Sequence, residues 1–310
     1  MRELSIIIVN YKSWNKLSMC LNSLLKQKEI RYEVIVVDNN SNDEKLLSFR
    51  QKYEWVKWIE NSKNYGFAKA CNIGAANTKS KWYLFLNPDT VIKSQSLNSL
   101  IEFCNTNPEH RIIGIKQLDN DKKHTNSFGM FLNFWSLSGL IRIIIRLKNG
   151  SYKSMNFKEI AHPDWISGSF ILIRKTDFNI LGGWDEDYWM YYEDMDLCKR
   201  GSKLGLKVSL LNNWICTHFH GESSRKNIKI KIITKSEVVF SSHIFLEKHS
   251  KTSYKLLNHL ILIMIQFTEL FFVSIVSQTK RTILFNCLKF WKTSLLNGSW
   301  ESKRVKINRC

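Results

Sequence analysis

Short apolar runs alternate with helical patterns at the start of the chain. Leu4–Val9 is an apolar run of strand length, a pattern typical of a strand buried on both faces of a parallel sheet. Apolar positions recur at helical spacing from Asn15 to Lys28, and Tyr32–Val37 is a second run of strand length. Together these segments predict a parallel βαβ unit, which restricts the chain to an α/β fold. In open α/β sheets, ligands bind at the carboxyl ends of the strands.

Polar residues follow the predicted strands at that edge. The second strand ends in Asp38-Asn39-Asn40-Ser41. A helix at Glu44–Tyr53, a short strand at Val56–Ile59 and a buried strand at Trp82–Leu86 come next, and the last ends in Asn87-Pro88-Asp89. An aspartate at such a strand end also occurs simply as a turn residue.

A glycine-containing segment, Asn64–Gly74, precedes that last strand. Its glycines, Gly66 and Gly74, would let the backbone approach a ligand closely. The segment is not a dinucleotide-binding fingerprint, because that pattern needs other glycine spacings directly after the first strand.

The stretch Gly182–Arg200 concentrates six carboxylates, two tryptophans and three tyrosines in nineteen residues, in a chain of net charge +19. A glycine pair before an acidic run predicts a turn into a helix that begins near Glu193. Acidic first turns and basic last turns are ordinary helix chemistry. The alternative is a cleft walled by aromatic rings, in which a desolvated carboxylate acts as a general base.

The seven cysteines are scattered and odd in number, without a CxxC pair. This pattern favours reduced thiols over disulfides or a zinc site. An apolar run begins within three residues of Met1, so we expect no signal peptide and a cytoplasmic location. Between Arg225 and Cys310, 16 Lys and Arg face 4 Asp and Glu, so +12 of the net charge lies in this region. A basic partner surface is therefore expected there.

In order and spacing, one set of motifs resembles glycosyltransferase family 2, most closely its bacterial rhamnosyltransferase-like group. The motifs are Ser5–Asn10, Val36–Ser41, Asn64–Gly74, Asn87–Asp89, Trp165–Gly168 with Arg174, Gly183–Glu186, Glu193–Leu197 with Arg200, and His218–Ser223. The resemblance covers roughly residues 3–225 and implies a GT-A fold, which is a Rossmann-like, mostly parallel sheet flanked by helices. Residues 1–225 would form the catalytic domain, and residues 226–310 a basic, apolar helical region.

The resemblance also implies a nucleotide-sugar donor, a divalent metal and single-displacement inversion at the sugar carbon. Asp89 matches the metal-binding aspartate of the family's DxD motif, although Asn87 occupies the first position of that motif. His218 matches the position that completes the metal shell, with His220 as an alternative and a packed core histidine as the structural reading. Mn²⁺ or Mg²⁺ is the expected ion, because hard cations prefer oxygen ligands and Mn²⁺ also accepts imidazole.

Asp194 matches the catalytic base of the family, which would take the proton of the acceptor hydroxyl. Glu193 and Asp196 would then orient Asp194 or contact the acceptor. Arg200 lies at i+4 from Asp196 and is expected to form an ion pair with it.

The resemblance further implies which residues meet the two substrates. Asn10 and Tyr11 would flank the nucleobase, and Asp38 and Asn39 would accept its imide N–H and the sugar hydroxyls. The remaining donor-side positions near the ribose and diphosphate are Asn64, Gly66, Asn72 and Asn87. The acceptor-side wall, where aromatic rings stack on sugars, would be formed by Trp165, Gly168 and Trp184.

The apolar stretch Leu256–Val276 approaches the length of a membrane span, but polar residues that include Gln266 and Glu269 interrupt it. Three arrangements remain open: a transmembrane helix, helices packed on the catalytic domain, and a helical region on an anionic membrane surface. The last would suit a polyprenyl-diphosphate-linked acceptor at the inner face of the membrane. A second basic and apolar patch is Leu140–Lys148.

Other functions are less well supported. A nucleic-acid-binding protein would explain the high pI, but we find no recognised motif for it, and the acidic aromatic stretch would repel phosphate. A non-catalytic relative is disfavoured by the presence of Asp89, Asp194 and His218. By family likeness we favour dTDP-rhamnose as donor, with a UDP-sugar of galactofuranose or N-acetylglucosamine as the alternative.

Overall fold

The computed structural model describes residues 2–93, 96–125, 127–131, 155, 158–219, 227–250 and 252–309. The chain divides into two units. One comprises Met1–Met130, Lys153–Asp185 and Glu193–Ser223, and the other comprises Phe131–Tyr152, Glu186–Tyr192 and Ser224–Cys310. The expected boundary at residue 225 lies close to the last of these divisions, but two segments from within the expected catalytic domain belong to the second unit. The patch Leu140–Lys148 lies outside the described residues.

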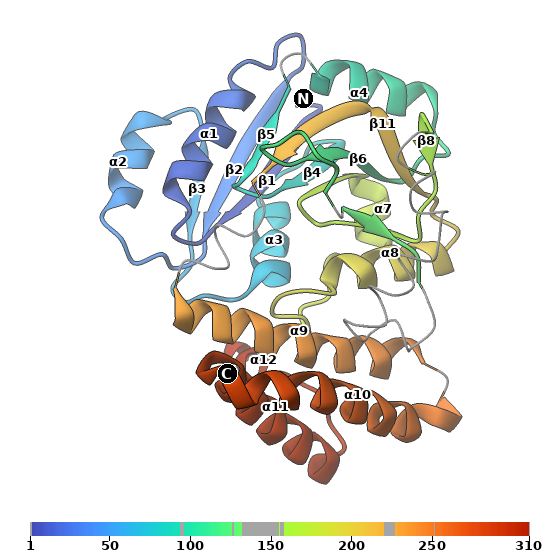
Figure 1. Cartoon of the computed structure of the whole chain (residues 1–310). Helices are drawn as coiled ribbons and strands as arrows, with labels where there is room; N and C mark the ends of the chain where they lie inside the picture. Colours follow the sequence, from blue (N-terminus) through green and yellow to red (C-terminus); the bar gives the residue numbers. More distant parts are fainter. Residues whose placement is uncertain are drawn as a thin grey trace. The chain divides into compact units, whose positions relative to one another are not determined.

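The first unit is built on a mixed sheet, nine-stranded within the described residues, with the order β3-β2-β1-β4-β10-β6-β11-β5 and with β8 paired to β11 (Figure 1). The strands are β1 (Leu4–Asn10), β2 (Tyr32–Asp38), β3 (Lys57–Glu60), β4 (Trp82–Leu86), β5 (Thr90–Ile92), β6 (Ile112–Leu118), β8 (Ile160–Ala161), β10 (Phe170–Arg174) and β11 (Val208–His218). Strands β3, β2, β1 and β4 are parallel, as are β6 and β11, whereas β10 runs antiparallel to both of its neighbours. The predicted α/β fold is confirmed.

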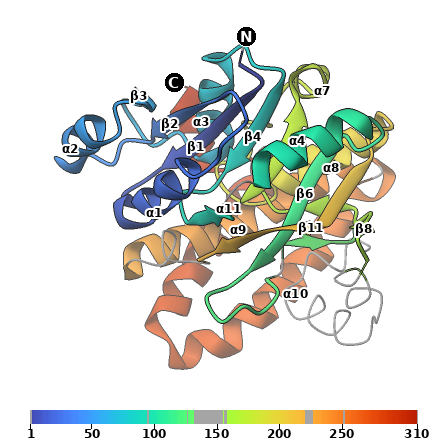
Figure 2. The ribbon, with the colours of Figure 1, turned by 90° about the horizontal axis from the view of Figure 1, so that it is seen from above.

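Helices cover both faces of this sheet (Figure 2). One face carries α1 (Trp14–Leu24), α2 (Lys45–Lys52) and α4 (Ser96–Thr106), and the other carries α3 (Phe67–Ala76), α7 (Lys175–Ile180) and α8 (Glu193–Lys203). Alternate residues of a strand point to opposite faces, so Ile6 and Ile8 join the core beneath α1, whereas Ile7 faces α3. The near-continuous apolar runs of the parallel strands follow from this two-sided burial.

Gly74 lets α3 lie close to β1. A β-carbon at Gly74 would be 2.5 Å from Cγ2 of Ile7, so a larger residue would push the helix off the strand. This corrects the expectation that Gly74 permits close approach to a ligand. Gly66 has φ +87° and stands immediately before α3, in a backbone conformation that glycine adopts readily.

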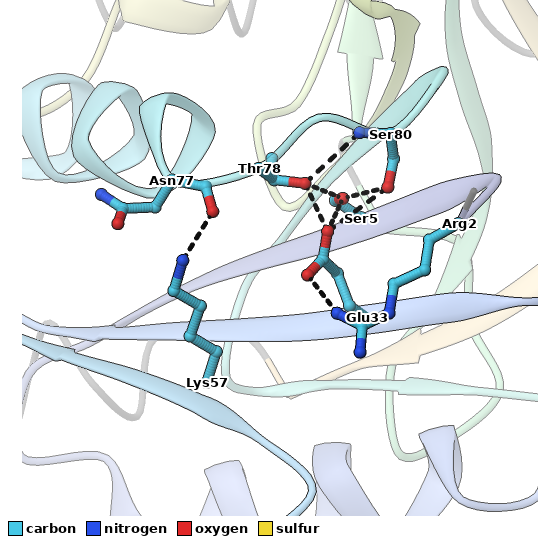
Figure 3. Close-up of polar contacts among 7 residues, drawn as sticks. All are labelled: Arg2, Ser5, Glu33, Lys57, Asn77, Thr78 and Ser80. Carbon is cyan, nitrogen blue, oxygen red and sulfur yellow. Dashed lines mark hydrogen bonds and ion pairs between the residues drawn. The ribbon is translucent and has the colours of Figure 1, made fainter.

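The amino-terminal edge of the parallel strands is closed by a polar cluster (Figure 3). The Glu33 carboxylate accepts hydrogen bonds from Arg2 (2.6 Å), Ser5 (2.8 Å) and Thr78. These contacts lower the pKa of Glu33 although its burial acts in the opposite direction. A hollow of about 480 Å³ is lined here by residues that include Arg2, Glu33 and Lys79. It lies at the edge opposite the carboxyl ends of the strands, where the sequence places the functional residues.

In the described part of the second unit, long helices predominate. They are α9 (Ile228–His249), α10 (Lys255–Val276), α11 (Gln278–Asn297) and the short α12 (Lys303–Arg309). The side chain of Asn227 caps α9, and Gly298, in the left-handed conformation, follows the last residue of α11. Cys287, Phe290 and Trp291 of α11 form the centre of a core to which α9 and α10 contribute. The predicted apolar helix at Leu256–Val276 is confirmed as α10.

Candidate active site

The carboxyl ends of β1 and β2 bring Asn10 and Asp38 together, because the two residues are register partners in the parallel pair. Asn10 Nδ2 donates to Asp38 Oδ1 (2.9 Å), and the Ser41 hydroxyl donates to the same oxygen (2.6 Å). The Ser41 backbone N–H donates to Asp38 Oδ2 (2.9 Å). All three residues are buried, and Tyr11 beside them is half-buried. Since a carboxylate has about four acceptor positions, Asp38 keeps roughly one for a further donor.

Asn39 has a different task from the one expected of it. Its Oδ1 accepts from Asn61 Nδ2 and from the Tyr65 backbone N–H, each at 3.0 Å. Its Nδ2 donates to Asn64 Oδ1 (2.9 Å) and to the Gly66 carbonyl (3.0 Å). Both acceptor positions of the amide oxygen are therefore occupied within the protein. This corrects the expectation that this oxygen accepts from a ligand, because Asn39 instead fixes the loop before α3.

Two other predicted donor-side residues also hold the backbone in place. Asn64 Oδ1 accepts from the Gly66 N–H (3.0 Å) in addition to Asn39. Asn72 donates to the Trp184 carbonyl (2.8 Å) and accepts from the Trp184 N–H (2.9 Å). The side chain of Asn72 therefore joins α3 to the loop after α7.

Asp89 and His218 form a buried pair at the ends of neighbouring strands. His218 is the last residue of β11 and pairs in register with Thr90, which adjoins Asp89. Nε2 of His218 lies 3.2 Å from Oδ1 of Asp89, and both side chains are about 96% buried. Asn87, half-buried, begins the turn that carries Asp89, with its carbonyl accepting from the Thr90 N–H (3.1 Å).

Gln117 of β6 sets the tautomer of His218. Nδ1 of His218 lies 3.0 Å from Oε1 of Gln117, an oxygen that can only accept. The proton of a neutral His218 is therefore on Nδ1, and the lone pair of Nε2 points toward Asp89. A buried glutamine in an otherwise apolar strand was the only sequence signal for this residue, and the sequence analysis did not use it.

The Asp89 and His218 pair fits a divalent cation. Two ligand atoms bound side by side to one octahedral ion at about 2.1 Å lie about 3 Å apart, close to the observed 3.2 Å. In the described part of the chain no group of three or more His, Cys, Asp or Glu could hold a metal. Two protein ligands still suffice for a Mg²⁺ or Mn²⁺ site that is completed by substrate phosphates and water. His220, the alternative ligand, lies outside the described residues.

The predicted base, Asp194, lies in the first turn of α8 and is half-buried. Its Oδ2 accepts from the Gly168 backbone N–H (3.0 Å), and its Oδ1 accepts from the Met195 N–H (2.8 Å). Burial raises the pKa of Asp194, and these N–H groups oppose that shift. The two bonds hold the carboxylate in one orientation.

Glu193 and Asp196 flank the base with different roles. Burial and the nearby charge of Asp194 raise the pKa of Glu193 well above its usual value, so Glu193 keeps its proton when Asp194 is ionised. Within the described residues, Oε2 of Glu193 has no hydrogen-bond partner. Asp196 forms the expected ion pair with Arg200 (2.6 Å), which donates to the Leu181 and Gly183 carbonyls. Asp196 is fully buried and thus holds the loop that precedes α8.

The predicted acceptor-side residues separate into two groups. Gly168 contacts Asp194 directly, as described, and Trp165 on β9 (Trp165–Ile166) is half-buried with its ring against Gly129 of β7 (Phe128–Gly129). Trp184 is 1% exposed, and its ring packs edge-on against Phe67 and Phe85. This corrects the expectation for Trp184, because a buried ring offers no face on which a sugar can stack.

A path of hydrogen bonds joins the base to the metal pair. Gly168 donates to Asp194, and the hydroxyl of the next residue, Ser169, donates to Gln117 Oε1 (2.8 Å). The same Gln117 oxygen lies against His218, whose other nitrogen faces Asp89. Ser169 directly follows the predicted acceptor motif and was also missed by the sequence analysis. The arrangement can bind a cation and keep a basic carboxylate at a fixed position relative to it.

Comparison with known proteins identifies the family. The description "Glycosyl transferase family 2" matches residues 5–178. The rhamnosyltransferase WbbL of Escherichia coli K12 is 29% identical over 232 residues, which cover 71% of this chain and 84% of WbbL. The N-acetylglucosaminyl-diphospho-decaprenol L-rhamnosyltransferase of Mycobacterium tuberculosis is 26% identical over 224 residues, 65% of this chain and 71% of the relative. The dTDP-rhamnosyl transferase RfbF of Shigella flexneri is 28% identical over 228 residues, 70% of each chain.

Solved structures share the fold. The mannosyltransferase PcManGT of Pyrobaculum calidifontis, in complex with GDP-Man and Mn²⁺, superposes with a TM-score of 0.57 at 13% identity and covers 96% of this chain and 76% of its own. Staphylococcus aureus TarS in complex with UDP-GlcNAc gives a TM-score of 0.54 at 17% identity and covers 99% of this chain and 83% of its own. The family description matches more than half of the chain, and its relatives include several rhamnosyltransferases. The chain therefore belongs to glycosyltransferase family 2, in its rhamnosyltransferase-like group.

Proposed function

We propose that the chain is an inverting, metal-assisted rhamnosyltransferase that moves L-rhamnose from dTDP-rhamnose to a growing cell-surface glycan or a polyprenyl-diphosphate-linked acceptor. The observation that carries the proposal is the hydrogen-bonded path from Asp194 through Gly168, Ser169 and Gln117 to the His218 and Asp89 pair. The choice of rhamnose and of a lipid-linked acceptor follows the names of the relatives.

In the proposed reaction the acceptor hydroxyl attacks the anomeric carbon of the donor from the face opposite the diphosphate. The carbon–oxygen bond to the diphosphate breaks, dTDP leaves, and the hydroxyl proton passes to Asp194. Glu193 keeps its own proton and can donate a hydrogen bond from its otherwise unpaired side to the acceptor. A divalent cation held by Asp89 and His218 would offset the negative charge that develops on the leaving diphosphate.

The donor would lie along the carboxyl edge of β1, β2 and β4. Asn10, Tyr11 and Asp38 are proposed to hold the nucleobase, since Asp38 retains an acceptor position suited to an imide N–H. Asn39 and Asn64 shape this end by fixing the loop before α3. On the acceptor side, the ring face of Trp165 turned away from Gly129 is the proposed stacking surface.

A reducing compartment suits the proposed cytoplasmic reaction. Six cysteines in the described part of the chain are free thiols, and all of them are buried. The nucleotide-sugar pool and the acceptor would then meet at the inner face of the membrane.

A thermal-shift panel with dTDP, UDP and GDP, each with and without Mn²⁺, tests the proposal on the wild type and on Asp89→Ala. We expect stabilisation by dTDP that depends on Mn²⁺ in the wild type and loses that dependence in Asp89→Ala. Selective stabilisation by UDP would instead support a UDP-sugar transferase of galactofuranose or N-acetylglucosamine. No shift with any nucleotide would overturn the proposal in favour of a non-catalytic relative.

A further inference from the structure

One side of α10 is anchored to α9 by buried polar contacts. Nδ1 of His259 lies 2.9 Å from Nδ1 of His243, and Nε2 of His259 lies 3.0 Å from Glu247 Oε2. Gln266 donates to the Ser242 hydroxyl (2.9 Å). His259 and Gln266, both on α10, are 1% and 5% exposed. These contacts fix which side of α10 faces the protein.

The other side of α10 is an apolar stripe exposed to solvent. The stripe consists of Leu257 (54% exposed), Leu260 (45%), Met264 (62%), Phe271 (43%) and Ile275 (59%). Its residues recur three, four or seven positions apart, so they lie on one side of the helix over about 27 Å. The hydroxyl of Thr268, which lies within the stripe, donates to the carbonyls of Met264 and Ile265 and so needs no water. Monomeric soluble proteins rarely expose a continuous apolar surface of this length.

Basic residues accompany the stripe. Arg281, in the first turns of α11, donates to the Ser274 and Ile275 carbonyls at the end of α10. Farther along α11, Lys289 and Lys292 are exposed beside Phe285, which is 58% exposed. The whole segment from Arg225 to Cys310 carries a net charge of +12.

We propose that the α10 stripe docks in the plane of an anionic lipid surface, with the basic residues of α11 at the headgroups. Interfacial helices combine an apolar face with a strongly basic surround, and each Lys or Arg near an anionic leaflet adds about 1 kcal/mol of attraction. The inference concerns lipid binding alone, so it does not depend on the proposed transfer reaction.

Two other occupants fit the observations less well. The helix α10 is long and apolar enough to cross a membrane, with a mean hydropathy of 2.0 in its best window. Crossing would remove His259 and Gln266 from their partners on α9 and expose these polar groups to lipid. A second copy of the chain would bring two strongly positive surfaces together, which like-charge repulsion opposes.

The test is flotation of the full chain, without nucleotide, with phosphatidylcholine vesicles that contain or lack phosphatidylglycerol. We expect binding only to the anionic vesicles, release at high salt, and roughly tenfold weaker binding of Met264→Glu. The matched control is Leu47→Glu on α2, because Leu47 is 65% exposed and thus as accessible as Met264. We expect Leu47→Glu to bind like the wild type.

Three results would overturn the proposal. One is the absence of binding to anionic vesicles at low salt. Another is bound protein that resists extraction by alkaline carbonate, which would indicate a membrane span. The third is a dimer in sedimentation that Met264→Glu dissociates, which would assign the stripe to a second copy. A null result in the nucleotide panel would leave the vesicle result unaffected, so failure of one proposal is distinguishable from failure of the other.

Discussion

Nε2 of His218 lies 3.2 Å from Oδ1 of Asp89, and the imidazole is held in this position by Gln117 on its other nitrogen. Residues that orient a metal-binding histidine commonly affect metal affinity by 10–100-fold. Gln117 is therefore a positioning residue that touches neither the proposed metal nor the substrates.

Replacing Gln117 with Leu removes the acceptor for Nδ1 of His218 and for the Ser169 hydroxyl. We expect Mn²⁺ affinity in the presence of nucleotide to fall by roughly tenfold or more, while metal-free nucleotide binding is retained. Titration of Mn²⁺ by calorimetry measures the effect, with Gln51→Leu at an exposed position of α2 as control. Unchanged Mn²⁺ affinity in Gln117→Leu would show that His218 is not oriented through this bond.

The two carboxyl groups at the start of α8 are expected to respond differently to neutral substitution. Asp194→Asn removes the proposed base and should lower the transfer rate by about 10²–10⁴-fold. Glu193→Gln should cost far less, because the raised pKa of Glu193 already keeps it protonated and uncharged. Initial rates with saturating donor give the comparison, and equal losses in the two variants would contradict the assignment of the base.

The pH profile adds a second check on Asp194. Burial raises its pKa, and the base must be ionised to accept a proton, so the transfer rate should rise with pH through a value above the usual range for aspartate. A rate that is independent of pH on the acid side would count against this role.

Much of the parallel half of the sheet was predictable, because buried strands such as Leu4–Asn10 and Trp82–Leu86 carry nearly continuous apolar runs. The sequence also predicted that Asn10 and Asp38 would meet, since parallel strands end at a common edge. What it could not provide were contacts between residues far apart in the chain. Gln117 meets His218 across 101 positions, and a polar residue in an apolar strand does not reveal its partner.

Burial is the other quantity that sequence patterns left open. Trp184 follows a glycine pair in an acidic, aromatic stretch, a context that fits a cleft wall as well as a core. The structure buries its ring against Phe67 and Phe85, because Asn72 holds its backbone against α3. Aromatic composition alone does not distinguish these two environments.

The amide of Asn39 donates two hydrogen bonds that a carboxylate could not donate. Asn39→Asp should lose both bonds and add a charge next to Asp38, with a stability loss of about 1–3 kcal/mol and weaker nucleotide binding. Asn40→Asp is the matched control, because its side chain makes one exposed bond to the Ser62 carbonyl. Denaturant unfolding and nucleotide titration measure both effects, and equal stability of the two variants would contradict the role of Asn39 in fixing the loop.

Glu237 of α9 makes the stability of the second unit depend on pH. It is 2% exposed, accepts from the Ser302 hydroxyl (3.0 Å), and burial raises its pKa to about 7 from the usual 4.5. Between these values the folded chain holds a proton that the unfolded chain has lost. The contribution of Glu237 to stability is therefore fully present below pH 4.5 and is lost as the pH rises to 7, by about 3 kcal/mol.

Glu237→Gln keeps an acceptor for Ser302 and removes this proton linkage. We expect the unfolding temperature of the variant, relative to wild type, to be higher at pH 8 than at pH 5. Glu54→Gln, at an exposed position, should show a constant difference across the same range. If the Glu237→Gln and wild-type curves stayed parallel, Glu237 would have to be ionised throughout. Its charge would then have to be neutralised by Arg304, whose Nε lies 3.5 Å from Oε1.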